Sequence, residues 1–200
     1  MSSITAEQVR DLRNQTGSGI MDCKNALTES EGDFEKAIDF LRKKGLAAAE
    51  KKGARVTSEG RISSYIHAGG KVGVMVEVAC ETDFVARNEE FDALVNDLCL
   101  HICAMNPLAV CREEVDPELV EKEKAFFVEQ LQDKPEQIRG KILEGKMNKW
   151  FSDQVLLEQS FVKDDKLTIQ DLITERIAKL GENIVVRRFV RLQLGEDISN

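Results

Sequence analysis

The chain has 200 residues, of which 42% are hydrophobic and 32% charged, and its formal net charge at pH 7 is −8. This length allows one sizeable core, or one core with a small satellite domain. The acidic balance argues against direct nucleic-acid binding, because phosphate backbones attract cationic proteins.

The N-terminal residues MSSITAEQVR contain neither a basic segment nor an apolar one, as a secretory signal would. No uninterrupted apolar run approaches the roughly 20 residues that a membrane helix needs. We therefore expect a cytoplasmic protein with no membrane partner.

The thiols indicate neither a disulfide framework nor a metal site. Cys99 and Cys103 lie one helical turn apart and could share a metal ion, but no second pair of Cys or His completes a tetrahedral site. Reduced structural thiols are the simpler interpretation, and a thiol or metal enzyme would require these two residues to be functional. The chain has five cysteines in all: Cys23, Cys80, Cys99, Cys103 and Cys111.

Three short helices are predicted between residues 5 and 45. Thr5 and Gln8 form a capping box at the start of the first, and the TGSG segment at 16–19 breaks it. Asp33 is a good N-cap for the third helix, which Gly45 should end. Apolar residues recur at helical spacing: Val9 and Leu12, then Ile20, Cys23 and Leu27, then Phe34, Ala37, Ile38 and Leu41.

Such a small bundle usually docks on another surface or serves as a docking module. The polar, Ala- and Lys-rich residues 47–60 read as a fraying helix followed by a linker. We place a domain boundary near Gly53, which divides the chain into domains at 1–53 and 54–200.

The second domain begins with strand patterns. Residues 61–67 alternate in polarity, AGGK at 68–71 is a turn, and valines occupy every second position of 72–78, so an antiparallel hairpin is predicted. Helical spacing follows from Phe91 to Met105, ended by Pro107. Further helices are predicted at 117–133, at 135–150 and from a Thr168 cap to Leu180. Residues 183–195 alternate as a final strand that should pair with the hairpin. The predicted fold class is α+β, a small antiparallel sheet with packed helices.

We find no pattern that indicates an active site. The chain lacks a phosphate-binding loop of the P-loop or dinucleotide type. TGSG could bind an anion at a helix N-terminus, but a turn between short helices is the simpler interpretation. His67 should face solvent at a strand end. His101 flanks the apolar stripe of its helix, where a partly buried structural role is favoured over a binding contact.

The segment ETDFVARN at 81–88 is harder to explain by structure alone. Asp83 could cap the next helix and Phe84 could fold back onto it as a hydrophobic staple. However, the stripe from Phe91 onward already supplies that helix with apolar residues. An aromatic side chain next to a carboxylate on a loop suits insertion into another protein.

Five segments resemble bacterial translation elongation factor Ts, in that family's order and from end to end of the chain: TGSGIMDCKNAL (16–27), TDFVARN (82–88), VEKE (120–123), GKMNKWF (145–151) and GENIVVRR (181–188). The chain is similar to the family's short form, with one core subdomain. The resemblance implies an N-terminal three-helix module of the ubiquitin-associated type, followed by an α+β dimerisation domain.

The resemblance also implies a function. Members of this family are guanine nucleotide exchange factors for elongation factor Tu, and they bind its GDP form and promote GDP release without chemistry or a cofactor of their own. The T-D-F-V segment, here Thr82, Asp83, Phe84 and Val85, pushes into the partner and disturbs its Mg²⁺ site. Further contacts map onto the N-terminal module and a later helix: Val9, Leu12, Arg13, Ile20, Met21 and His101.

Two alternatives stay open at this stage. Leu12 and Ile20 also lie on the bundle's own apolar stripe, so Met21 is the stronger candidate for a surface contact. The chain could also be a plain interaction module that tethers a partner without affecting nucleotide. Because the short form has one core subdomain, a homodimer is expected to complete the bound assembly.

Overall fold

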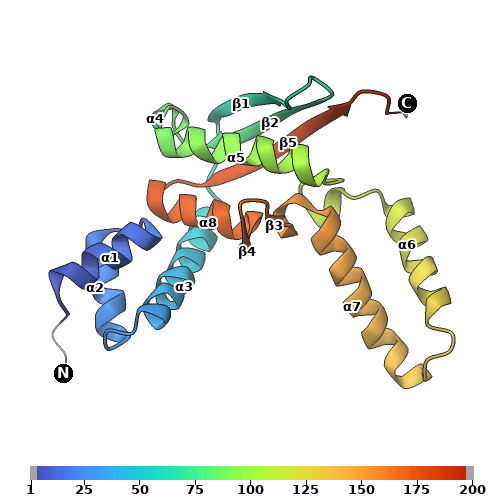
Figure 1. The fold of residues 1–200 in the computed structure, drawn as a ribbon, viewed down its shortest axis with the longest axis horizontal. Coiled ribbons are helices and arrows are strands. Elements are labelled where there is room, and N and C mark those ends of the chain that lie inside the picture. Colours follow the sequence, from blue (N-terminus) through green and yellow to red (C-terminus); the bar gives the residue numbers. More distant parts are fainter. Residues whose placement is uncertain (1–3, 197–200) are drawn as a thin grey trace. The chain divides into compact units, whose positions relative to one another are not determined.

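A computed structural model describes residues 4–196 (Figure 1). Eight α-helices and five β-strands lie within these residues, which confirms the α+β prediction. The chain divides into two compact units. The first comprises the residues up to 61, then 79–94 and 171–185, and the second comprises 62–78, 95–170 and the residues from 186 onward.

The first unit begins with the predicted three-helix bundle: α1 (Ala6–Thr16), α2 (Ile20–Glu29) and α3 (Phe34–Lys52). The capping box forms as predicted, with the Thr5 hydroxyl accepting from the Gln8 amide and the Gln8 side chain accepting from the Thr5 amide. The bundle has its own small core: Val9, Leu12, Cys23, Ala26, Leu27, Ala37 and Leu41. Its likeness to a ubiquitin-associated domain stays a prediction.

Helix α3 does not end at Gly45, so that prediction is wrong. Leu, Ala, Glu and Lys follow the glycine, and these strong helix formers carry the helix on to Lys52. Gly45 is buried, and a Cβ built on it would lie 3.7 Å from the Cβ of Ala178 on helix α8 (Ile169–Leu180). An alanine side chain would therefore be in ordinary van der Waals contact with α8 at this position. The end of α3 lies next to the domain boundary proposed near Gly53, which itself remains a prediction.

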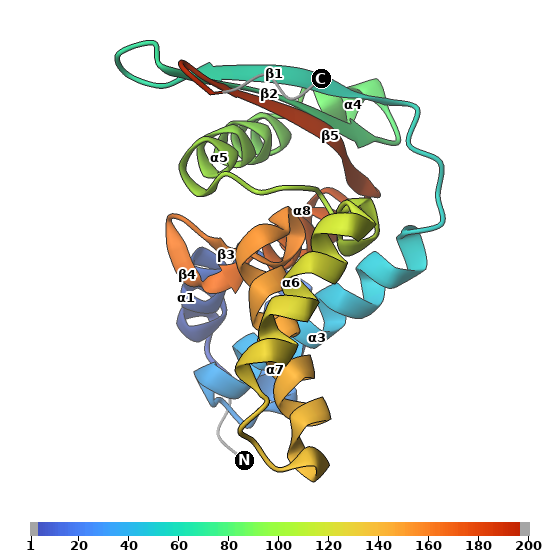
Figure 2. The same ribbon diagram turned by 90° about the vertical axis from the view of Figure 1, so that its right-hand side faces the viewer.

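A three-stranded sheet contains β1 (Glu59–Ile66), β2 (Val72–Cys80) and β5 (Ile184–Gln193) in the order β1-β2-β5. The predicted hairpin and the pairing of the last strand with it are therefore confirmed. Within the second unit, Val74, Val76 and Val78 are buried on one face of β2. The C-terminal part of α5 (Glu89–Met105) lies along one face of the sheet (Figures 1 and 2).

Helices α6 (Pro117–Gln130) and α7 (Glu136–Gln154) form a hairpin, close to the two helices predicted there (Figure 2). Neither helix buries a residue completely. Their base is held by a small cluster of Ala109, Val115 and Val155, against which Trp150 and Phe151 pack. Two short 3-10 helices, η1 (Arg112–Glu114) and η2 (Leu156–Glu158), flank this cluster.

After α7, residues 160–168 form a small antiparallel hairpin of β3 (Ser160–Phe161) and β4 (Asp164–Thr168). Only Phe161 of this hairpin is buried, so no alternating pattern marks it in the sequence. Helix α8 follows directly after Thr168, as predicted. Among the residues that the structure describes, no helix is long and apolar enough to cross a membrane.

Candidate partner-binding loop

The segment after β2 leaves the sheet and forms one helical turn, α4 (Asp83–Ala86), before α5 begins. Thr82 is the N-cap of this turn, and its Oγ1 accepts from the Val85 amide at 3.5 Å. Asn88 then caps α5, because its Oδ1 accepts from the Glu90 amide at 2.8 Å. Two capped helix starts thus follow each other within eight residues. Sequence reasoning missed α4, whose four residues are too few for a periodic pattern.

Phe84 projects into solvent with 83% of its surface exposed, more than any other large apolar residue among those described. The alternative in which Asp83 caps the helix and Phe84 packs back onto it is therefore wrong. Thr82 provides the cap instead. Asp83 is half-buried and pairs with Arg87 one turn later, at 3.2 Å between Oδ2 and Nη2. Val85 is half-buried as well.

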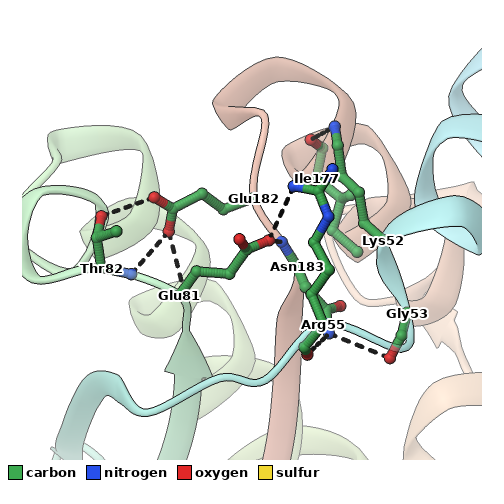
Figure 3. A network of polar contacts seen from close by, with 8 residues as sticks. All are labelled: Lys52, Gly53, Arg55, Glu81, Thr82, Ile177, Glu182 and Asn183. Atoms are coloured by element: carbon green, nitrogen blue, oxygen red, sulfur yellow. Dashed lines mark hydrogen bonds and ion pairs between the residues drawn. The ribbon is translucent and has the colours of Figure 1, made fainter.

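A carboxylate from a distant segment fixes the start of the loop (Figure 3). Glu182, in the turn between α8 and β5, accepts the backbone N–H groups of Glu81 and Thr82 on Oε2, at 3.1 and 3.0 Å. Its Oε1 accepts the Thr82 hydroxyl at 2.6 Å. Sequence reasoning gave Glu182 no role, because about a hundred residues separate it from the loop.

Asn183, the next residue, is buried and hydrogen-bonds both the start of the loop and the linker after α3 (Figure 3). Its side-chain amide donates to the carbonyl oxygens of Gly53 and Arg55 at 3.3 and 3.0 Å. Its backbone N–H donates to Glu81 Oε1 at 2.7 Å, and Arg55 Nη1 lies 3.5 Å from the same oxygen. The loop and the linker therefore share one polar network.

The candidate contacts on the N-terminal bundle separate into buried and exposed residues. Val9 and Leu12 belong to the bundle's core, where Leu12 is completely buried and Val9 is only 9% exposed. Ile20 and Met21, in the first turn of α2, are 56% and 65% exposed, so the core position considered for Ile20 is wrong. Arg13 is also exposed. TGSG forms a turn, in which Gly17 has a left-handed φ of 66° and ends α1.

His101 is completely buried in the second unit, so its side chain has no surface to offer a partner. The Val162 amide donates to its Nδ1 at 3.2 Å, and its Nε2 lies 3.0 Å from Gln159 Oε1. Because Nδ1 accepts a hydrogen bond, the proton of the neutral ring sits on Nε2. Desolvation lowers the pKa of His101, and the bond to Gln159 opposes that shift only in part. This environment matches the structural role favoured above, and the contact role implied for His101 has no support here.

The described residues hold no group of three or more His, Cys, Asp or Glu side chains placed to bind a metal ion. Burial raises the pKa of Cys80 and of Cys99 to about 11, which keeps both as neutral thiols at pH 7. His67, the other histidine, is exposed and contacts the Tyr65 hydroxyl at 3.1 Å. The loop with Phe84 is therefore the feature that calls for a functional explanation.

The sheet also has an exposed apolar face in the second unit. Antiparallel strands usually alternate between buried apolar and exposed polar residues. Here the outward positions carry large apolar side chains that are each more than half exposed: Ile62, Ile66, Met75, Val190 and Leu192. Glu77 and Arg188 pair on the same strands at 2.7 Å. We call this surface the outer sheet face.

Comparisons with known proteins agree with this description. The family model described as "Elongation factor TS" matches residues 49–196. Elongation factor Ts of Geobacter metallireducens is 59% identical over 199 residues, which cover 98% of this chain and 92% of that protein. Elongation factor Ts of Geotalea uraniireducens is 57% identical, and the match covers 98% of this chain and 92% of that protein. Elongation factor Ts of Fervidobacterium nodosum is 56% identical over 195 residues, covering 96% of this chain and 99% of that protein.

The family match and these relatives place the chain among the translation elongation factors. Within that class, it belongs to the elongation factor Ts family.

Proposed function

We propose that this chain is a guanine nucleotide exchange factor for elongation factor Tu. It binds the GDP form of that protein, inserts the Thr82–Val85 loop, disturbs the partner's Mg²⁺ site and promotes GDP release. In this role the chain performs no covalent chemistry, needs no cofactor and works in the cytoplasm without contacting nucleic acid or membrane.

The observation that carries the proposal is the exposure of Phe84 on a loop that the rest of the first unit holds in place. A single-turn helix with no buried residue contributes little to this chain's own core. A large apolar side chain that is 83% exposed gains free energy when a partner covers it. The loop therefore has the features of an insertion element.

Magnitudes show that the loop cannot act alone. Accelerating GDP release on the order of 10³-fold requires lowering the barrier by about 4 kcal/mol. Burying one Phe side chain supplies roughly 1.5–3 kcal/mol. Other contacts must therefore hold the two proteins together while the loop acts. The exposed pair Ile20 and Met21 on α2, together with the exposed Arg13 on α1, supplies a second docking surface on the bundle.

The loop acts on the metal indirectly. Mg²⁺ demands a near-octahedral ligand set at short distances, so a small displacement of the loops that hold it is costly. Phe84 wedges between partner side chains, and Asp83 leaves Arg87 to compete for polar contacts near the nucleotide phosphates. By linkage, bound GDP must weaken the binding of this chain by the same factor as this chain weakens the binding of GDP.

The test is the release of fluorescent GDP from elongation factor Tu at increasing concentrations of this chain. The wild-type chain should accelerate release, and Phe84→Ala should reduce the stimulated rate about tenfold or more, since burying a Phe side chain is worth roughly 1.5–3 kcal/mol. Phe126→Ala on α6 is the matched control, because that residue is also an exposed phenylalanine, at 52%. Circular dichroism checks that both variants are folded.

The same experiment separates this proposal from a simple tether. A tether would form a complex with elongation factor Tu and leave the GDP off-rate unchanged. Stimulation by the wild-type chain that Phe84→Ala retains in full would remove the loop from the mechanism.

We also propose that two copies of this chain associate through the outer sheet face. Its apolar residues lie on three adjacent strands, and a two-fold axis can pair such a face with itself. Contiguous exposed apolar surface of this kind usually marks an interface. The dimer would present two loops to two partner molecules.

Light scattering coupled to gel filtration tests the dimer. Val190→Lys, on strand β5 of the outer sheet face, should convert a dimer to a monomer, because it places a charge in an apolar contact. Val162→Lys, on the exposed turn between β3 and β4, is the control, since Val162 is also exposed at 43%. A wild-type monomer at micromolar concentration, or a Val190→Lys dimer, contradicts this part of the proposal.

A further inference from the structure

The short turn between α8 and β5 carries two adjacent polar residues that hold different parts of the first unit (Figure 3). Gly181 ends α8 with a left-handed φ of 81°, and its N–H donates to the Ile177 carbonyl at 3.0 Å. This conformation reverses the chain at the end of the helix and is one that glycine adopts without strain. Glu182 then reaches the loop after β2, and Asn183 reaches the linker after α3.

The carboxylate of Glu182 accepts three hydrogen bonds from the start of the loop. Strand β2 ends at Cys80, so the backbone N–H groups of Glu81 and Thr82 lie beyond the last strand residue. Neither N–H can be paired by the strand ladder, and one charged oxygen of Glu182 serves both. Glu182 therefore fixes the point at which the chain leaves the sheet.

The bond to the Thr82 hydroxyl also acts on α4. Because this hydroxyl donates its proton to Glu182 at 2.6 Å, its oxygen lone pairs are free to accept from the Val85 amide. The carboxylate thus orients the group that caps the helical turn. Phe84 belongs to that turn and lies in sequence between Thr82, the capping residue, and Val85, whose amide Thr82 accepts.

Helix α4 has little stability of its own. It contains four residues, none of them buried, and helix nucleation is unfavourable at such a length. Its orientation must therefore come from its ends. At the N-terminal end of α4, the backbone N–H and the hydroxyl of Thr82 both donate to the Glu182 carboxylate.

The neighbouring Asn183 fastens the linker that follows the N-terminal bundle. It donates to the carbonyls of Gly53 and Arg55, and Lys52 at the end of α3 donates to the Ile177 carbonyl at 3.5 Å. The bundle carries the exposed Ile20 and Met21, and the loop carries Phe84. Both surfaces are thus attached to the same turn.

We propose that Glu182 is a positioning residue for nucleotide exchange: it holds the Thr82–Val85 loop in the orientation in which Phe84 enters the partner. This inference rests on the exchange function proposed above. Removal of the carboxylate would leave docking through the bundle intact and impair the step that follows it. Glu182 itself need not touch the partner.

Two measurements on Glu182→Ala and the isosteric Glu182→Gln test the proposal. In the free chain, amide hydrogen exchange of residues 81–86 should become about tenfold faster or more in Glu182→Ala, while α1–α3 keep their protection. With elongation factor Tu, the maximal stimulated rate of GDP release should fall about tenfold, since misplacement by an ångström is costly. The concentration of chain that gives half-maximal stimulation should change less than about threefold. Glu182→Gln keeps the shape of the side chain but loses its charge. Its amide exchange rates at residues 81–86 and its maximal stimulated rate should therefore lie between those of the wild type and Glu182→Ala.

Variants of Thr82, whose hydroxyl donates to Glu182, test the same contact from its other side. Thr82→Ser keeps the hydroxyl and should preserve the protection of residues 81–86, whereas Thr82→Val should lose it. In the double variant Thr82→Val, Glu182→Ala, the loss in the maximal rate of GDP release should be smaller than the two single losses combined, because both substitutions remove the hydrogen bond between Thr82 and Glu182. Glu144→Ala on α7, an exposed glutamate, is the control and should match the wild type in both measurements.

The outcomes separate this inference from the proposed function. A wild-type chain that does not accelerate GDP release overturns the proposed function. A wild-type chain that accelerates release, with Glu182→Ala equal to it in maximal rate or in loop protection, overturns the positioning role alone. Equal losses in maximal rate and in apparent affinity would indicate general destabilisation and also count against it. If Glu182→Ala does not fold, Glu182→Gln decides by the same criteria.

Discussion

The buried imidazole of His101 should make the stability of this protein depend on pH in a range where few other side chains titrate. Desolvation lowers the pKa of His101 in the folded chain below its ordinary value. Protonation would also place a second N–H on Nδ1, which accepts from the Val162 amide. The folded state therefore keeps the ring neutral, whereas the unfolded chain binds a proton near pH 6.5.

The sign and size of the effect follow from proton linkage. The unfolded state binds more protons below pH 6.5, so the free energy of unfolding falls as the pH drops from 6.5 towards the pKa of the folded state. Between pH 7.5 and 5.5 the loss can reach about 1.4 kcal/mol for one group. Above pH 7.5 this contribution no longer changes, because the ring is neutral in both states.

Urea unfolding at a series of pH values checks this prediction. Trp150 is the chain's one tryptophan, and it reports on the second unit, to which His101 also belongs. His101→Gln removes the titrating ring, and its unfolding free energy should vary less between pH 7.5 and 5.5 than that of the wild type. His67→Gln is the matched control at the exposed histidine and should keep the wild-type dependence. Parallel curves for the wild type and His101→Gln would refute the reasoning.

Two further predictions concern thiols and a backbone conformation. At pH 8, a disulfide reagent should label the half-buried Cys111 about tenfold or more faster than Cys80 or Cys99. Desolvation raises the pKa of all three thiols, but Cys80 and Cys99 are buried and reach about 11. Mass spectrometry of the labelled chain can measure the order of labelling, and equal rates would contradict the prediction. Gly17→Ala should lower the free energy of unfolding by roughly 1–2 kcal/mol because φ is 66° there. Gly19→Ala, at φ −61°, introduces no such backbone strain and should lower it less. Circular dichroism in urea compares the two, and equal losses would count against backbone strain at residue 17.

Most of the fold could be predicted because its elements leave local patterns in the sequence. The valines of β2 alternate at every second position, and three of them are buried on one face. The capping box at Thr5 marks the start of α1 within four residues. These signals depend on neighbours in the chain, so a single sequence contains them.

The failures have two causes. Gly45 resembles a helix end, but the strong helix formers that follow it carry α3 on to Lys52, so this one glycine does not end the helix. The β3–β4 hairpin is too short for a period, and α4 is a single turn. Tertiary contacts decide these short elements, and local propensity does not show them.

The candidate site shows the same limit. The composition of residues 81–88 suggested an insertion loop, and the exposure of Phe84 fits that interpretation. The role of Glu182 depends on a contact across about a hundred residues, which no spacing in the chain indicates. His101 lies beside an apolar stripe, a position compatible with surface or interior, and only the fold shows that it is buried.

The exposure of Phe84 has a consequence for how this position tolerates change. Its ring contributes almost nothing to the interior of its own chain, so a laboratory selection for expression or heat resistance would accept nearly any replacement there. Some polar replacements would even be enriched, because they remove an exposed apolar side chain that promotes aggregation. Only a selection that includes the partner can reveal why an aromatic ring stands at that place.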